Sequence, residues 1–273
     1  MVSMKDVNLS KRMEAVVNMV SPQSFTIADV GCDHAYVSIA LMQRQLAEKV
    51  IAMDVRTGPL DIAKRNVKEA GYSDVIDIRL GDGLERLEPG EVDAVIIAGM
   101  GGLLMKGILE RGLHIVCNDK KRPVLILQPQ SDLKEVRMFL YRHEYHIVCE
   151  TMLVEDGKYY TVMKAEPVVP DQNVGSNQVN MDESGIDWLS VDEEAYSEEE
   201  WVYGRCNLRN QNETLLAFLQ KERKVLQQIM DKVETSIRKS IEAQEEIPEP
   251  TRQRMDSIKG EMAVNERALT YFG

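Results

Sequence analysis

The sequence Thr26-Ile-Ala-Asp-Val-Gly-Cys-Asp-His-Ala-Tyr36 decides the fold of this chain. It begins as a short apolar run with one acid, Gly31 opens a polar turn, and apolar residues at helical spacing follow from Ala35. This pattern predicts a buried parallel strand at 26–31, a tight turn and a helix at about 35–46. In open α/β sheets the crevice at such a turn binds nucleotide-like ligands. A structural strand–helix turn without a ligand is the alternative.

Helix and strand patterns also lie before and after this strand–turn–helix segment. Residues 8–20 predict an amphipathic helix with Ser10 as its N-cap. Downstream, apolar runs predict parallel strands separated by helices, and these strands are Lys49–Met53, Val75–Leu80, Val92–Ala98 and Val124–Leu127. Between Val92–Ala98 and a helix through Leu109, we expect a loop at Gly99–Gly102.

The chain then changes from alternating strands and helices to two consecutive strands. The β-rich runs Tyr145–Val154 and Lys158–Lys164 are separated only by Glu155-Asp156-Gly157. Asp-Gly between strands is a strong hairpin signal. Dinucleotide-binding folds continue with parallel strands, whereas class I methyltransferases end in a hairpin that inserts an antiparallel strand. The sequence therefore predicts an α/β fold with a class I (Rossmann-like) methyltransferase sheet and a terminal antiparallel hairpin.

The remaining chain divides into an acidic stretch and a helical region. Residues 168–200 carry ten acids and no Lys or Arg, which predicts a solvated linker or loop, although Trp188 and Trp201 suggest that part of it docks. From about Gln211 onward, apolar residues at helical spacing predict a helical hairpin that packs as an antiparallel coiled coil. Helices folded onto the main domain are the alternative. The expected domains are therefore 1–167, 168–200 and 201–273.

Composition bounds the cellular context. The 273 residues carry a net charge of −12, most of it within 168–200, so a nucleic-acid-binding face elsewhere is compatible with the total. The four cysteines are far apart and form no Cys-x-x-Cys pair, which favours reduced thiols over zinc or disulfides. No signal-peptide core or membrane-spanning run is present. We therefore expect a cytoplasmic protein with no metal and no membrane partner.

Acidic residues follow three successive strands. Asp54 ends the second strand and is placed to accept ribose hydroxyls, and Asp82 with Gly83 follows the third, where a carboxylate can accept the amine of adenine. Asp33 and His34 lie in the first turn. Each Asp alone is more often a helix cap or a solvated turn residue. Together, in register at consecutive strand ends, they favour a nucleoside cofactor.

The first turn also distinguishes between cofactors. After Gly31 it lacks the second and third glycines that let a pyrophosphate lie on a helix N-terminus. Asp33 would place a negative charge where the phosphate charge has to lie. An acid there suits a ligand with an ammonium and a sulfonium group. The sequence therefore predicts S-adenosyl-L-methionine.

Several motifs together are characteristic of one family; they are Asp29-Val-Gly-Cys-Asp-His-Ala, Asp54, Gly81-Asp82-Gly, Ala98-Gly-Met-Gly-Gly and Gln128-Pro-Gln. In these motifs the chain resembles the bacterial tRNA (adenine-N1)-methyltransferases of the TrmK family, which modify the adenosine at position 22. The resemblance runs from Leu9 to about Pro167 and resumes near Trp201. It implies a class I methyltransferase domain and a C-terminal coiled-coil domain.

The resemblance also implies roles for individual residues. It places Gly31, Asp33 and His34 near the methionine part of the cofactor, Asp54 on the ribose, and Asp82 and Gly83 at the adenine. The predicted cofactor-binding set is completed by Cys32, Val55, Ala98 and Gly99. Met100 and Gly101 lie where amino-methyltransferases carry an Asn/Asp-Pro-Pro-aromatic motif, and Asp29 and Arg12 are candidates for orienting the substrate or managing charge on the methylated adenine.

The absence of an Asn/Asp-Pro-Pro-aromatic motif agrees with methylation of adenine N1, because N1 has an in-plane lone pair that attacks a sulfonium methyl without prior proton removal. We expect a tRNA partner, contacted by cations of both folded domains, and favour a monomer. Two other interpretations stay open at this point. One is a methyltransferase acting on a small molecule or protein, and the other is a non-catalytic interaction protein with an empty Rossmann-like core.

Overall fold

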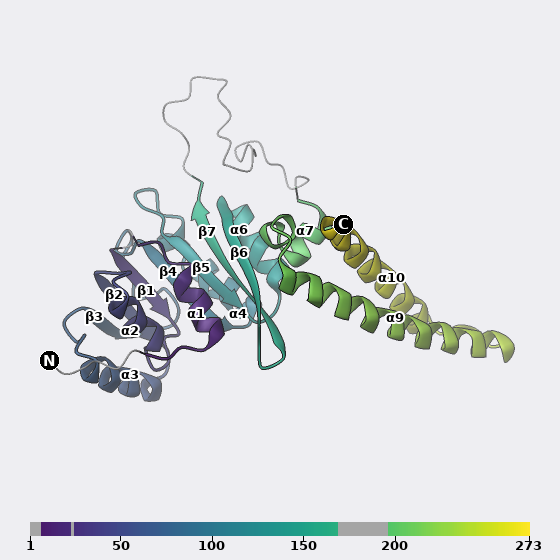
Figure 1. Ribbon diagram of the computed structural model, residues 1–273, viewed down its shortest axis with the longest axis horizontal. Coiled ribbons are helices and arrows are strands. Elements are labelled where there is room, and N and C mark those ends of the chain that lie inside the picture. Colours follow the sequence, from purple (N-terminus) through teal and green to yellow (C-terminus); the bar gives the residue numbers. More distant parts are fainter. Residues whose placement is uncertain (1–6, 23–24, 169–195) are drawn as a thin grey trace, which may run out of the picture. The chain divides into compact units, whose positions relative to one another are not determined.

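The computed structural model describes residues 7–22, 25–168 and 196–273 and divides the chain into two compact units, 1–193 and 194–273 (Figure 1). The first unit contains a seven-stranded sheet with the order β3-β2-β1-β4-β5-β7-β6. Its strands are β1 (Thr26–Val30), β2 (Lys49–Asp54), β3 (Ile76–Leu80), β4 (Ala94–Met100), β5 (Val124–Pro129), β6 (Tyr145–Glu155) and β7 (Lys158–Pro167).

The sheet is parallel except at its terminal hairpin. β1 pairs in parallel with both β2 and β4, whereas β7 is antiparallel to β5 and to β6. The predicted fold class is thereby confirmed. Asp156 and Gly157 connect β6 to β7 with φ of 49° and 73°, the left-handed conformations that an Asp-Gly hairpin turn requires.

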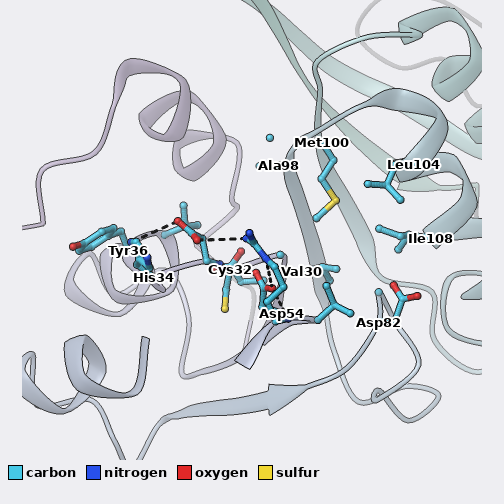
Figure 2. A pocket seen from close by; sticks show the side chains of 18 of the residues that line it. Val30, Cys32, His34, Tyr36, Asp54, Asp82, Ala98, Met100, Leu104 and Ile108 are labelled. Carbon is cyan, nitrogen blue, oxygen red and sulfur yellow. Dashed lines mark hydrogen bonds and ion pairs between the residues drawn. The ribbon is translucent and has the colours of Figure 1, made fainter. Parts of the chain in front are cut away.

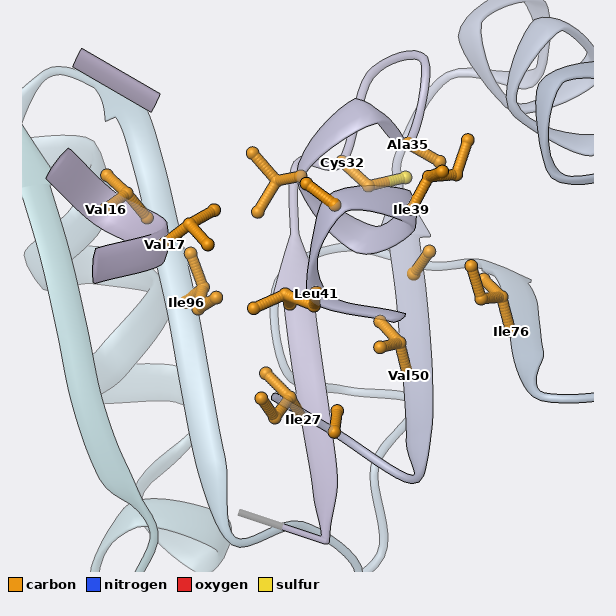
Figure 3. Close-up of a cluster of buried hydrophobic side chains, with 14 of the residues drawn as sticks. Val16, Val17, Ile27, Cys32, Ala35, Ile39, Leu41, Val50, Ile76 and Ile96 are labelled. Carbon is orange, nitrogen blue, oxygen red and sulfur yellow. The ribbon is translucent and has the colours of Figure 1, made fainter. Parts of the chain in front are cut away.

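The central strands are buried on both faces. On one face, α1 (Lys11–Asn18), α2 (Tyr36–Gln43) and α3 (Thr57–Glu69) share a hydrophobic cluster with strand residues such as Ile27, Val50 and Ile96 (Figure 3). The neighbouring residues Ala28 and Ile97, whose side chains point to the opposite face, are buried as well. The other helices of this unit are α4 (Gly102–Arg111), α5 (Leu113–Val116) and α6 (Leu133–Arg142).

The helix before the sheet forms for the reason that its sequence indicates. The Ser10 side chain accepts a hydrogen bond from the backbone N–H of Met13 and caps α1. Val16 and Val17 are fully buried in the shared cluster, which fixes the helix against the sheet. Burial of each such side chain contributes about 1.5–3 kcal/mol. Helix α1 also contacts β6 and β7, the last two strands of the unit.

The predicted bounds of the fourth strand are wrong. The strand begins at Ala94 and continues through Gly99 and Met100, which we expected in a loop. It continues because a bulge between Ala98 and Met100 restores pairing with Pro129, and Gln130 donates its N–H to the carbonyl of Met100.

The second unit consists of helices. They are α7 (Glu198–Tyr203), α8 (Arg205–Arg209), α9 (Glu213–Glu242), α10 (Glu249–Leu269) and the 3₁₀ helix η3 (Thr270–Phe272). Helices α9 and α10 contact each other through a cluster around Leu226, Met230 and Ile258. This contact agrees with the predicted helical hairpin.

The end of the expected acidic linker is helical instead. Ser197 and Glu200 form a reciprocal capping box, so Glu198–Glu200 belong to the first turn of α7 rather than to a loop. Trp201 is buried and stacks on Tyr196 with a ring-centroid separation of 4.4 Å. Trp188 and most of the expected linker lie outside the described residues.

Candidate active site

A cavity of about 570 Å³ opens at the carboxyl ends of β1, β2 and β4 and beside the turn after β3. In Figure 2, His34 and Tyr36 lie on one side of it, and Met100, Leu104 and Ile108 lie on the other. The predicted site residues that line the cavity are Arg12, Asp29, Gly31, Cys32, Asp33, His34, Asp54, Val55, Asp82, Gly83, Ala98, Gly99 and Met100.

The predicted catalytic residue Gly101 is not part of this lining. Gly101 precedes α4 as its N-cap, where a Cβ would lie 3.4 Å from the Ser131 Oγ. The same hydroxyl accepts a hydrogen bond from the N–H of Gly102. In this structure Gly101 therefore contributes to the start of a helix rather than to the cavity wall.

The turn after β1 is fixed by backbone geometry. Gly31 has a φ of 73°, and the N–H groups of Gly31 and Cys32 both donate to the carbonyl of Met53 at the end of β2. A Cβ on Gly31 would lie only 2.2 Å from the terminal methyl of Met100, so the two residues pack directly against each other. Glycine is favoured here chiefly by the left-handed backbone, because the Met100 methyl is the far end of a flexible side chain and can move aside.

Asp29 lies buried at the base of this turn. Its carboxylate accepts a 2.6 Å hydrogen bond from the Ser38 hydroxyl on α2. Burial raises the pKa of Asp29 from 3.8 to about 6, against the opposing effect of that hydrogen bond. Near neutral pH, Asp29 therefore places a buried negative charge beside the cavity.

Asp54 connects the ends of β1 and β2. Its side chain is 5% exposed, its Oδ2 accepts the N–H of Asp33 at 3.3 Å, and its Oδ1 accepts the N–H of Arg56 at 2.9 Å. The Arg56 guanidinium also forms ion pairs with Asp54 at 3.5 Å and with Asp33 at 3.8 Å. The Arg56 Nε–H donates to the same Oδ1 at 3.5 Å. The carboxylate is thus held in place, and a lone pair of Oδ2 is left for a ligand.

Asp82 is positioned less firmly than Asp54. Its side chain is 51% exposed and forms a 3.3 Å ion pair with Arg111 at the end of α4. Solvent weakens an ion pair at such a position. Any contact between Asp82 and a ligand should therefore contribute less than a contact with Asp54.

Cys32 and His34 differ in what they present to the cavity. The Cys32 side chain belongs to the hydrophobic cluster, and burial raises the pKa of its thiol, so it remains protonated and is no nucleophile. The ring of His34 lies 3.6 Å from an Asp33 carboxylate oxygen and is partly exposed. The backbone carbonyl of His34 accepts a hydrogen bond from Asn66 on α3, which anchors the turn.

Arg12 reaches the cavity from α1 and is held by the terminal hairpin. Glu155 accepts the backbone N–H of Arg12 at 3.2 Å, and a second Glu155 oxygen lies 3.9 Å from the Arg12 Nε. The guanidinium lies over the ring of Tyr160, 4.9 Å from its centroid. Neither Glu155 nor Tyr160 was expected at the site.

Sequence reasoning also missed part of the cavity wall. The lining residues outside the prediction are Met13, Val30, Tyr36, Val37, Arg56, Gly81, Leu104 and Ile108. A signal was available for some of them: Tyr36 directly follows the first turn, and Leu104 and Ile108 are four residues apart on one face of α4. Arg56 follows the ribose candidate Asp54 by two residues.

The donor set of the cavity fits a cationic nucleoside cofactor. Its lining holds four acids, Asp29, Asp33, Asp54 and Asp82, against two cations, Arg12 and Arg56, and this excess of negative charge suits a sulfonium and an ammonium and opposes a pyrophosphate. Within the described ranges, no group of three or more His, Cys, Asp or Glu side chains is arranged to hold a metal ion. No helix of those ranges combines the length and apolarity needed to cross a bilayer.

Comparison with known proteins gives consistent results. A family described as a methyltransferase domain matches residues 9–163. The tRNA (adenine(22)-N(1))-methyltransferase of Bacillus subtilis is 40% identical over 163 residues, which are 60% of this chain and 67% of that protein.

Solved structures extend the similarity to nearly the whole chain. The crystal structure of the B. subtilis m1A22 tRNA methyltransferase TrmK has a TM-score of 0.76 and 28% identity, covering 96% of this chain and 99% of that one. Sp1610 of Streptococcus pneumoniae, in complex with S-adenosyl-L-methionine, has a TM-score of 0.69 and 28% identity over 96% of this chain and 100% of its own.

Proposed function

The chain belongs to the methyltransferase-domain family and, within it, to the TrmK tRNA methyltransferases, and on this premise we propose that it methylates N1 of the adenosine at position 22 of tRNA. The methyl donor is S-adenosyl-L-methionine, which is bound in the structure of the S. pneumoniae relative. The observation on this chain that supports the proposal best is the meeting of Asp29, Asp33 and Asp54 in one cavity.

We propose the following roles within this cavity. Asp54 accepts the ribose hydroxyls, Asp82 and Gly83 border the adenine, and Gly31, Asp33 and His34 surround the methionine part. Support for these roles comes from the strand ends that carry the residues, which follow one another along one edge of the sheet. Val55, Ala98, Gly99 and the backbone of Cys32 complete the cofactor-binding lining.

When bound, S-adenosylmethionine supplies an electrophilic methyl group. The N1 lone pair of adenine forms the new N–C bond while the C–S bond breaks and its electron pair stays on sulfur, so positive charge moves to the adenine. No proton has to leave N1 beforehand, and the protein's task is to hold N1 in line with the S–CH₃ bond and to exclude water. We propose that Met100, which packs on Gly31, forms part of the cavity wall that positions the adenine and excludes water.

The charges of Asp29 and Arg12 have opposite effects on the methylated adenine. The methylated adenine is cationic, so the buried negative charge of Asp29 is favourable nearby and a cation is not. Arg12 therefore fits a role in orienting the tRNA better than one in balancing charge on the base.

We propose that the protein acts as a monomer in the cytoplasm, where its tRNA substrate is found. The wide spacing of Cys32, Cys117, Cys149 and Cys206 along the sequence, with no Cys-x-x-Cys pair, supports a reducing compartment. Light scattering after gel filtration tests the monomer, since a dimer would double the mass expected from 31.0 kDa.

The decisive experiment compares two unmodified tRNA transcripts that differ only at position 22. We expect labelled S-adenosylmethionine to transfer its methyl group to the transcript with adenosine there and not to the one with guanosine. Because N1-methylation blocks Watson–Crick pairing, arrest of reverse transcription locates the product. If neither transcript is labelled although the cofactor binds, the tRNA substrate is wrong and a small molecule or another protein becomes the leading candidate.

A further inference from the structure

The terminal hairpin extends beyond the sheet at the edge where the cavity lies. β7 is antiparallel to β5, with Met163 opposite Leu127. In this register Thr161 is level with the end of β5 at Pro129, and β7 continues three residues further, to Lys158. At about 3.3 Å per residue the hairpin therefore overruns β5 by about 10 Å. Figure 1 shows the turn between β6 and β7 extending past the neighbouring strands.

This extension brings the hairpin to Arg12. Glu155 is the last residue of β6; its Oε1 accepts the backbone N–H of Arg12, and its Oε2 lies 3.9 Å from the Arg12 Nε. Tyr160 of β7 offers its ring face to the guanidinium. The side chains of Arg12 and Glu155 are only 23% and 16% exposed, so this ion pair is better shielded than a surface pair.

These contacts orient the Arg12 side chain but do not satisfy all of its hydrogen-bond donors. Its Nε is buried and has no hydrogen-bond acceptor within the described ranges, because 3.9 Å exceeds hydrogen-bond distance. Among the cations that line the cavity, Arg56 is paired with the cavity acids Asp33 and Asp54, whereas Arg12 is paired with Glu155 of the hairpin through its buried Nε side. Within the described ranges the two Nη groups of Arg12 form no hydrogen bond, so they are the donors left for a ligand. Arg12 thus offers N–H donors of a cationic group at a cavity where the other cation, Arg56, is taken up by the cavity acids.

We propose that Glu155 and Tyr160 are positioning residues, which hold Arg12 so that its guanidinium binds a backbone phosphate of the tRNA beside the flipped adenosine. The proposal rests on the tRNA methyltransferase function given above. A guanidinium matches the paired oxygens of a phosphate and stays charged at all relevant pH values. The hairpin thereby has a role in substrate placement besides completing the sheet.

The test is a double-mutant cycle read in methyl transfer to the adenosine-22 transcript. We expect Arg12→Gln to lower kcat/KM for tRNA about tenfold or more, the scale of a charge-assisted hydrogen bond. Glu155→Gln and Tyr160→Leu should each lower it about two- to fivefold. Combined with Arg12→Gln, neither should cause further loss, because both act through Arg12.

Three further readouts separate positioning from general damage. The Kd of S-adenosylmethionine should stay constant in all variants, and Tyr160→Phe, which keeps the ring face, should retain more activity than Tyr160→Leu. Arg12→Gln should also lower the salt dependence of tRNA binding by about 0.7–0.9 in the slope of log K against log salt. Glu166→Gln, near the opposite end of the same hairpin and paired with Lys164, is the matched control and should leave kcat/KM unchanged.

The outcomes are distinguishable. The positioning role is overturned if the losses multiply in the double variants, or if cofactor affinity falls while the kinetics with tRNA stay normal. In either case methylation of the transcript by the wild-type protein still supports the proposed function. A wild-type protein that methylates no tRNA overturns the proposed function and this inference together. If Tyr160→Leu fails to fold, the isosteric Glu155→Gln carries the cycle.

Discussion

Removal of the Asp54 carboxylate should weaken cofactor binding more than any other single change at the acidic strand ends. Asp54 is 5% exposed, and its two oxygens already accept the backbone N–H groups of Asp33 and Arg56 at 3.3 Å and 2.9 Å. A buried, oriented carboxylate of this kind makes hydrogen bonds to a ligand worth about 1.5–3 kcal/mol. Asp54→Ala should therefore raise the Kd of S-adenosylmethionine about 10- to 150-fold.

Asp54→Asn sharpens this prediction. The amide retains one accepting oxygen but turns an NH₂ group toward one of the two backbone N–H donors, so it cannot accept both. We therefore expect Asn to lose nearly as much affinity as Ala, although it has the size of Asp. Asp82→Ala should cost no more than about 1 kcal/mol, because Asp82 is half exposed and paired with Arg111.

Isothermal titration calorimetry with S-adenosylmethionine and S-adenosylhomocysteine measures these differences. Asp61→Ala is the control, since Asp61 is an exposed residue of α3 that pairs with Lys64 and lies outside the cavity. Circular dichroism establishes that each variant is folded. A folded Asp54→Ala protein with a Kd within twofold of wild type would remove Asp54 from the binding site and refute the reasoning.

Two further predictions concern the turn and the charge beneath it. Gly31→Ala should lower the free energy of unfolding by about 1–2 kcal/mol, because its φ is 73° and the new Cβ displaces the Met100 methyl. Gly58→Ala is the control, since a Cβ there meets open space and should cause no such loss. Equal urea-unfolding curves for the two variants would contradict this. Burial raises the pKa of Asp29 to about 6, so the unfolded chain releases this proton at lower pH, and the contribution of Asp29 to the free energy of unfolding falls as pH rises from about 4 to 6. Asp29→Asn should remove up to about 3 kcal/mol of that fall, and a wild-type-minus-variant difference independent of pH would disprove it.

The order of elements could be read from the sequence because each signal is local. The apolar run ending at Gly31, the Asp156-Gly157 turn and the Ser10 cap each act within a few residues, and all three form as predicted. The strand ends place Asp33 and Asp54 at one edge as soon as the sheet is parallel. Local patterns missed the end of β4, where pairing between Met100 and Pro129 overrides the loop-like glycines.

Only the tertiary structure could decide which distant side chains meet at the cavity. Arg12 and Glu155 are 143 residues apart, and nothing in either segment indicates their contact. The contact follows from the inserted antiparallel strand, which carries the hairpin past β5 and back to α1. The raised pKa of Asp29 likewise depends on burial beneath the turn, and the approach of Met100 to Gly31 depends on the pairing of β1 with β4. The sequence determines the elements and the acids at their ends, whereas packing sets the environment of each charge, because burial and contact are properties of the assembled sheet and not of any one segment.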